Sequence, residues 1–224
     1  MDETASPPSV RLSAVGENAL LLDAAAAVLA QDVQEKIWDL AGTVEQWPDV
    51  REVVPGMNNL LIIFDGLRCD PADLKRQLLL AWQQAGGGVK TGRTIEIPVH
   101  YGGAAGVDLP FLADQRSLSI AEIIDLHSAG DYTVYAIGSQ PGFGYFAGLD
   151  PRLATPRRTS PRIRVEAGSV MIGGAQAGIM ACTSPSGWHI LGRTDIRLFD
   201  PNRSPPVLLA PGDRIRFTVA SITP

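Results

Sequence analysis

The first third of the chain alternates short apolar runs with stretches of helical periodicity. VRLSA and NALLLD flank a Gly16–Asn18 turn, and VREVV and NNLLIIF flank Pro55–Gly56. Apolar runs of this length on either side of Gly, Pro and Asn are typical of strands joined by tight turns. Each pair therefore predicts a β-hairpin.

A helix is expected after each hairpin. Asp32 can cap or charge the start of the first helix, and six apolar residues share one of its faces: Val33, Ile37, Leu40, Ala41, Val44 and Trp47. The second has Asp70 as N-cap, Pro71 at its first position and glycines 86–88 as its stop. The resulting order of strands and helices predicts a small α+β layer.

Beyond these glycines, short strands recur between Gly, Pro, Asp and Ser turns. The expected strands are TIEIPVHY, DYTVYAIG, RIRVEAGSVMIGG, AGIMACT, GWHILGRT, RLFD and DRIRFTVAS. One helix interrupts them, with Ser119 and Glu122 as a capping box and Gly130 as its stop. Such spacing predicts a closed barrel or sandwich. We expect a flexible tail over 1–9, an α+β domain over 10–93 and a β-rich domain over 94–224.

Composition narrows the class of protein. The 224 residues contain 19 Lys+Arg against 24 Asp+Glu, a net charge of −5, which argues against general nucleic-acid binding. Cys69 and Cys182 are far apart and predict reduced thiols rather than a disulfide framework. No run of 18 apolar residues and no apolar signal region occur. We expect a cytoplasmic protein without a membrane span.

One segment departs from this acidic balance. Residues 151–165, here called the arginine segment, contain no acidic residue and five arginines: Arg152, Arg157, Arg158, Arg162 and Arg164. Pro156 and Pro161 predict an irregular surface loop. Arginine binds carboxylate and phosphate bidentately. The segment is either an anion site or a solvated strand edge.

Glycine-rich motifs and histidines add weaker candidates. In PGFGYF the aromatic rings either wall a pocket or pin a turn, and in GSVMIGGAQAG the glycines let strands bend while Gln176 is placed to enter a cavity. GSVMIGGAQAG is neither a P-loop nor a Rossmann fingerprint. His100, at a strand end, is the histidine best placed for a site, whereas His127 suits a helix C-terminus. The spacing of His and Cys predicts no metal site.

Read together, four motifs resemble one family. They are PVHYGG…DL, the run from PGFGYFAGLDPRLATPRRTSPRIRV to GGAQAGI, SPSGWHILGRTDIRLFDP, and LLAPGDRIRF. In this order they resemble the family of the 5-oxoprolinase B subunit, also called KipI or allophanate hydrolase subunit 1, over about residues 10–217. The resemblance implies a small N-terminal α+β domain followed by a C-terminal cyclophilin-like β-barrel.

The resemblance also implies partners and chemistry. Members assemble with an A-type subunit and with a larger, C-type subunit of the carboxyltransferase type. The complex hydrolyses the cyclic amide 5-oxoproline to glutamate in a reaction driven by ATP. ATP would bind in the assembled complex, with no metal or biotin attached to this chain. Two alternatives stay open: inhibition of a sensor histidine kinase, and one half of a biotin-dependent urea or amide carboxyltransferase.

Site residues follow from the matching motif positions. The anion clamp is expected at Arg157, Arg158, Arg162 and Arg164. The pocket wall and lining are expected at Pro141, Gly142, Phe143, Tyr145, Gln176, Gly187 and Trp188, with His100 and Tyr101 on the neighbouring rim. The chain departs from the family pattern at Ala104, Ala177 and Met180, where relatives commonly carry polar side chains. A different amide substrate, or binding alone, therefore stays open.

Overall fold

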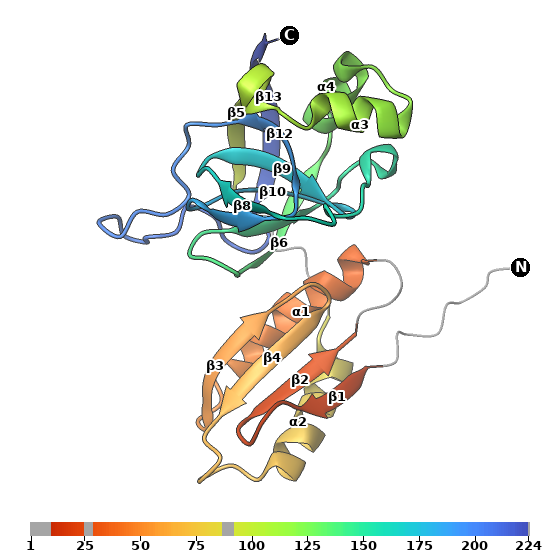
Figure 1. Cartoon of the computed structure of the whole chain (residues 1–224). Helices are drawn as coiled ribbons and strands as arrows, with labels where there is room; N and C mark the ends of the chain where they lie inside the picture. Colours follow the sequence, from red (N-terminus) through yellow and green to blue (C-terminus); the bar gives the residue numbers. More distant parts are fainter. Residues whose placement is uncertain (1–9, 25–28, 87–91, 224) are drawn as a thin grey trace, which may run out of the picture. The chain divides into compact units, whose positions relative to one another are not determined.

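The computed structural model describes residues 10–24, 29–86 and 92–223, and the chain divides between Lys90 and Thr91 into two compact units (Figure 1). The division lies shortly before the boundary expected after Arg93. The expected tail at 1–9 and the glycines at 87–88 lie outside the described residues. No helix among the described residues is long and apolar enough to cross a membrane.

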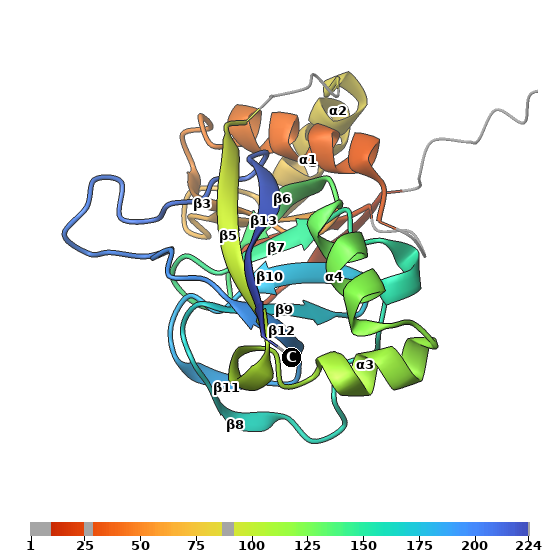
Figure 2. The same cartoon turned by 90° about the horizontal axis from the view of Figure 1, so that it is seen from above.

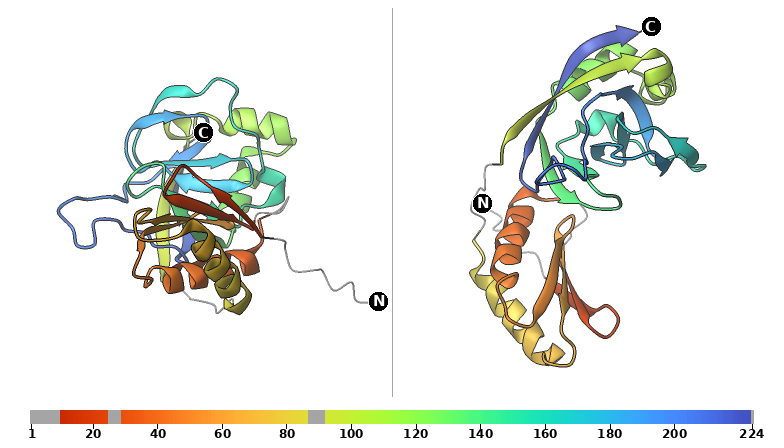
Figure 3. Two further views of the ribbon diagram at one scale, coloured as in Figure 1. Left: turned by 90° about the horizontal axis from the view of Figure 1, so that it is seen from below. Right: turned by 90° about the vertical axis from the view of Figure 1, so that its left-hand side faces the viewer.

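The first unit is a four-stranded antiparallel sheet of order β1-β2-β4-β3 with two helices over one face (Figure 3). Its elements are β1 (Arg11–Ala14), β2 (Ala19–Asp23), α1 (Gln31–Val44), β3 (Val50–Pro55), β4 (Asn59–Phe64) and α2 (Pro71–Gln84). Alternate residues of β4 are buried, as expected when one face of a strand lies against a core. Both predicted hairpins and both predicted helices are confirmed.

Local signals set the helix ends of this unit. The side chain of Asp70 accepts a hydrogen bond of 2.9 Å from the amide of Ala72, and Pro71 opens α2, as predicted. In α1 the N-cap is Ala30, which makes no side-chain cap, and Asp32 lies in the first turn. An acidic side chain in the first turn stabilises the positive end of the helix dipole, so Asp32 charges the start without capping it.

The second unit is a closed barrel of seven strands in the order β10-β7-β6-β13-β5-β12-β9. Its strands are β5 (Thr94–Gly102), β6 (Tyr132–Ile137), β7 (Gly144–Ala147), β9 (Ser169–Gly173), β10 (Gln176–Ile179), β12 (His189–Arg193) and β13 (Arg214–Thr223). Strands β5 and β13 run parallel, side by side in Figure 2, and the other barrel pairs are antiparallel. The expected α+β layer and barrel are thus confirmed.

Short elements surround this barrel. They are η1 (Gly103–Ala105), α3 (Leu109–Arg116), α4 (Ile120–Ser128), η2 (Pro151–Leu153), β8 (Arg162–Val165) and β11 (Ser184–Ser186). Strands β8 and β11 pair as a separate two-stranded sheet. The predicted capping box of α4 is present, with Glu122 Oε2 accepting from the Ser119 amide at 2.7 Å.

Three local expectations were wrong. Helix α3 was not predicted, because it is short and shows little periodicity. RLFD is not a strand: Phe199 makes only an isolated bridge to Val207. RIRVEAGSVMIGG is two strands, β8 and β9, separated by a turn at Gly168. Helix α4 ends just before Gly130, as expected, although Gly130 does not adopt left-handed backbone. A Cβ there would lie 2.6 Å from the ring of Tyr132, so Gly130 is required for packing.

Candidate anion-binding site

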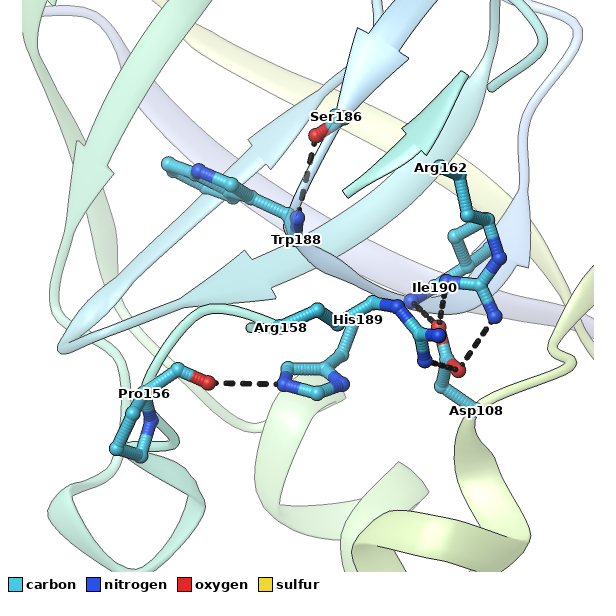
Figure 4. A network of polar contacts seen from close by, with 8 residues as sticks. All are labelled: Asp108, Pro156, Arg158, Arg162, Ser186, Trp188, His189 and Ile190. Atoms are coloured by element: carbon cyan, nitrogen blue, oxygen red, sulfur yellow. Dashed lines mark hydrogen bonds and ion pairs between the residues drawn. The ribbon is translucent and has the colours of Figure 1, made fainter. Parts of the chain in front are cut away.

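Between η2 and β8 the arginine segment is an irregular loop tied to the barrel unit at three points, whereas Arg162 and Arg164 lie on strand β8. Thr155 and Gly174 form an isolated antiparallel bridge, with N–O distances of 3.1 and 2.7 Å. The carbonyl oxygen of Pro156 lies 2.9 Å from Nε2 of His189 (Figure 4). The amide of Arg158 donates to the carbonyl of Gly187 at 2.7 Å. The loop predicted from its prolines is therefore held in one conformation.

A buried carboxylate lies beneath two of its arginines. Arg162 donates from both terminal nitrogens to Asp108, at 2.8 and 2.7 Å, and Arg158 approaches the same carboxylate at 3.4 Å (Figure 4). Asp108 also accepts from the amide of Ile190 at 2.7 Å, and its side chain is 3% exposed. A buried carboxylate requires such charged and hydrogen-bonding partners. The two guanidinium groups are therefore neutralised in part from within the fold.

Two further arginines pair with carboxylates that flank the segment. Arg152 binds Asp150 at 2.8 Å, and this side-chain hydrogen bond holds the pKa of Asp150 at about 2. Arg164 binds Glu166 at 2.6 Å and likewise lowers the pKa of that carboxyl. Both carboxylates are therefore charged at neutral pH.

Arg157 is the arginine of the segment that makes no ion pair with any residue the structure describes. Its guanidinium lies over the ring of Trp188, with its carbon 5.4 Å from the ring centroid. A guanidinium above an indole face is attracted by the ring's negative electrostatic potential. This contact holds Arg157 at the surface and leaves its hydrogen-bond donors available.

Two aromatic residues of PGFGYF, Phe143 and Tyr145, pack against each other and against Trp188 beneath this arginine, whereas Phe146 belongs to the barrel core. Phe143 and Trp188 are 6% and 5% exposed, and their ring centroids lie 5.7 Å apart, edge to face. Tyr145 contacts both rings. Together with Val165, Met171, Met180 and Ile190 they form a small core separate from that of the barrel. In the structure these rings therefore fill a core.

Glycines make room for this small core. A Cβ on Gly173 would lie 2.7 Å from the ring of Trp188, and one on Gly178 would lie 3.2 Å from the rings of both Phe143 and Trp188. Gly142 has φ of 82°, which favours glycine, in the connection between β6 and β7. Gln176 is half-buried at the start of β10, opposite Gly173, while Pro141 is exposed.

His100 and Tyr101 lie on opposite faces of β5, as successive strand residues do. His100 is exposed, and its Nδ1 lies 2.8 Å from the hydroxyl oxygen of Ser221. Tyr101 is 1% exposed and shares a 2.8 Å hydrogen bond with Nδ1 of His127 inside the barrel. The prediction that Tyr101 lies on a rim was wrong, because its side chain belongs to the barrel core.

His127 also has a different role from the one expected. It is fully buried among Tyr101, Tyr132 and Phe217, and burial lowers its pKa to about 3. A favourable interaction with the helix dipole requires the protonated ring. His127 is neutral at physiological pH, so that role is excluded and the residue serves packing and hydrogen bonding.

A cavity of about 420 Å³ adjoins the arginine segment, between η1, β8 and the ends of β9 and β12. Arg162 and Arg164 line it, as does Ala104. A third guanidinium comes from Arg193, at the end of β12. Sequence reasoning missed both Arg193 and Asp108. Their separation from the segment gives no local signal, although Asp108 lies in the motif YGGAAGVDL.

The residues around this cavity and the arginine segment do not form a metal-binding cluster among the residues that the structure describes. Within the described ranges, no three His, Cys, Asp or Glu side chains come together as a set of metal ligands. The groups that do converge here are guanidiniums beside apolar side chains. Such a combination binds anions through charge-assisted hydrogen bonds.

The family model and the similar proteins found by comparison agree with one another. A family model described as carboxyltransferase domain, subdomain C and D, matches residues 10–209. The chain is 42% identical over 203 residues to the 5-oxoprolinase B subunit of Escherichia coli O157:H7, covering 91% of this chain and 93% of that protein. It is 44% identical over 189 residues to the 5-oxoprolinase B subunit of Haemophilus influenzae, covering 84% and 88%.

Solved structures share this fold. The crystal structure of TTHA0988 matches with a TM-score of 0.77 and 33% identity over 95% of this chain. The match covers 40% of the TTHA0988 chain, so this chain spans about two fifths of that structure. The K. lactis urea amidolyase matches with a TM-score of 0.81 at 20% identity, covering 96% of this chain and 15% of that one. At that identity the likeness concerns the fold alone.

Proposed function

Because this chain belongs to the family of the 5-oxoprolinase B subunit, with the carboxyltransferase subdomain C and D architecture, we propose that it is a non-autonomous subunit of an ATP-dependent 5-oxoprolinase. The observation that carries the proposal is the identity of 42% to a protein of that name over 91% of this chain. The A-type subunit would complete the enzyme together with the larger carboxyltransferase-type subunit.

The proposed reaction explains why cations are useful here. The amide of a five-membered lactam is a poor electrophile, and transfer of the terminal phosphoryl group of ATP to its oxygen would activate the carbonyl carbon. Water then adds to that carbon and the C–N bond breaks, which gives an acyl phosphate of glutamate. A second water hydrolyses this acyl phosphate, so that the final products are glutamate, ADP and phosphate. Transfer of a phosphoryl group requires positive charge to stabilise the transition state. Arginine supplies that charge together with directional donors.

Among the arginines expected to form the clamp, we assign the anion contact to Arg157. Asp108 occupies Arg158 and Arg162, and Glu166 occupies Arg164. Arg157 keeps its donors available while Trp188 fixes its position. In this proposal Arg158 and Arg162 hold the shape of the loop, and Arg157 contacts a substrate or nucleotide anion in a site that the partner completes.

The test is reconstitution. The chain is co-purified with the A-type subunit, together with the larger carboxyltransferase-type subunit, and 5-oxoproline-dependent ADP and glutamate formation are measured. Turnover is expected only from the complete mixture. Equal turnover from a mixture lacking this chain would overturn the proposal, as would turnover by this chain alone.

A further inference from the structure

The cavity beside the arginine segment combines an apolar wall with guanidinium groups. Val107, Val165 and Ile190 supply apolar side chains, and Arg162, Arg164 and Arg193 supply the charge. Its volume of about 420 Å³ falls in the range of small-molecule sites in proteins, roughly 300–1,000 Å³. The residues come from strands of the barrel unit and the turn after β5, so the wall is built on a rigid scaffold.

The charges around the cavity do not cancel. Arg162 is held by Asp108 behind the wall, and Arg164 is held by Glu166, which also lines the cavity. Arg193 makes no ion pair within the part of the chain that the structure describes. Its charge adds to the lowering of the pKa of Glu166, which is due mainly to the hydrogen bond from Arg164. Asp108 is shared between Arg162 and Arg158, and Glu166 pairs with Arg164, so the two carboxylates leave positive charge uncompensated around the cavity.

We propose that this cavity binds a small organic monocarboxylate. Arg193 holds the carboxylate, Arg164 lies beside it, and the hydrocarbon part of the ligand packs on Val107, Val165 and Ile190. The uncompensated guanidinium of Arg193 beside an apolar wall matches an organic anion. An inorganic phosphate would leave some of its oxygens against apolar side chains without donors, which is costly. The inference rests on the cavity of this chain and does not depend on the proposed function.

The experiment uses the full chain without any partner. Calorimetric titrations compare benzoate with benzamide, its neutral analogue of nearly the same shape, and with inorganic phosphate. We expect benzoate to bind about tenfold or more tightly than either. Arg193→Met keeps the aliphatic part of the side chain and removes its charge, and it should weaken benzoate binding about 10- to 100-fold. The control, Arg197→Met, replaces an exposed arginine that does not line the cavity and should bind as the parent does.

NMR can also locate the benzoate site directly on the parent protein, without any variant. Benzoate should shift the backbone amide resonances of Val107 and Ile190 and the side-chain Nε–H resonances of Arg164 and Arg193. Any of three results overturns the proposal: equal affinity for benzamide, unchanged affinity in Arg193→Met, or amide shifts that miss the cavity. Phosphate binding as tight as benzoate binding, lost in the same variant, would also overturn it in favour of an inorganic-anion site.

Discussion

Arg162 holds Asp108 with both terminal nitrogens of its guanidinium, at 2.7 and 2.8 Å, although 54 positions separate the two residues. The carboxylate is almost fully buried, and the amide of Ile190 and the guanidinium of Arg158 complete its contacts. This pair joins the turn before α3 to strand β8. It fixes one wall of the candidate site and the base of the arginine segment.

Asp108→Asn should destabilise the barrel unit. The amide keeps the shape of the side chain but leaves two partly buried guanidiniums without their counter-charge. Removal of one partner of a buried ion pair costs about 3–5 kcal/mol, and we expect about 3 kcal/mol because both arginines keep some exposure. Denaturant unfolding measures this loss. Glu166→Gln removes an exposed pair and should cost less than about 1 kcal/mol. Equal losses in the two variants would contradict the burial argument.

Gly173→Ala should disturb the small core under the arginine segment. The added methyl group would lie 2.7 Å from the indole of Trp188, so the ring must move. Overpacking of this kind costs about 1–3 kcal/mol. Gly138→Ala is a matched control, because a Cβ there meets no atom within 4 Å, and its unfolding midpoint should stay near that of the parent. Thermal unfolding compares the two, and an unchanged midpoint for Gly173→Ala would show that the indole can shift freely.

His127 should make stability fall at acidic pH. Burial puts its folded-state pKa at about 3, below the ordinary value of 6.5, so between these values the unfolded chain binds a proton that the folded chain does not. Stability is then lost as pH falls below about 6.5, by at most about 1.4 kcal/mol per pH unit. His127→Asn should flatten this dependence between pH 6.5 and 4. His100→Asn, at an exposed position, should not. Identical pH profiles for His127→Asn and the parent would refute the assignment.

Arg157→Met should impair the reconstituted enzyme without changing stability. The guanidinium is exposed and makes no ion pair with the described residues, so loss of folding free energy should be small. Loss of one charge-assisted hydrogen bond in the closed site should reduce kcat/KM about 10- to 100-fold. Arg157→Lys should restore only part of the lost kcat/KM, because one ammonium group cannot reproduce the paired, coplanar hydrogen bonds of a guanidinium. Arg152→Met, at an exposed arginine paired with Asp150, is the control. Parent-like activity in Arg157→Met would remove this residue from the site.

The elements that sequence predicted well are those whose signals are local. Asp70 and Pro71 open α2, and Ser119 with Glu122 opens α4, because each signal involves residues within three positions of one another. The hairpins of the first unit follow from apolar alternation around tight turns. Helix α3 lacks such a signal: the carboxylate of Asp108, its N-cap residue, makes no cap and is used by distant arginines.

The candidate site was predicted only in part, because its partners come together from distant positions. The arginine segment was identified by composition, and its loop character by prolines. Which arginine is left without a carboxylate depends on Asp108, which the chain brings in from the turn after η1. Arg193 reaches the cavity through the pairing of β12 with β9, opposite Ser169. No spacing along the sequence encodes either relation.

The parallel pairing of β5 with β13 has a consequence for the order of folding. Arg93, just before β5, donates to Asp213, just before β13, and 120 positions separate them. The barrel therefore cannot close until nearly its whole length has been synthesised, and contacts so distant along the chain make folding slow. The α+β unit, whose core uses only residues that precede Gly86, can fold while the barrel strands are still emerging from the ribosome. During synthesis, β5 therefore stays unpaired for seconds along the edge that β13 will later cover. In that time a chaperone, or a strand of another chain, can bind this exposed edge.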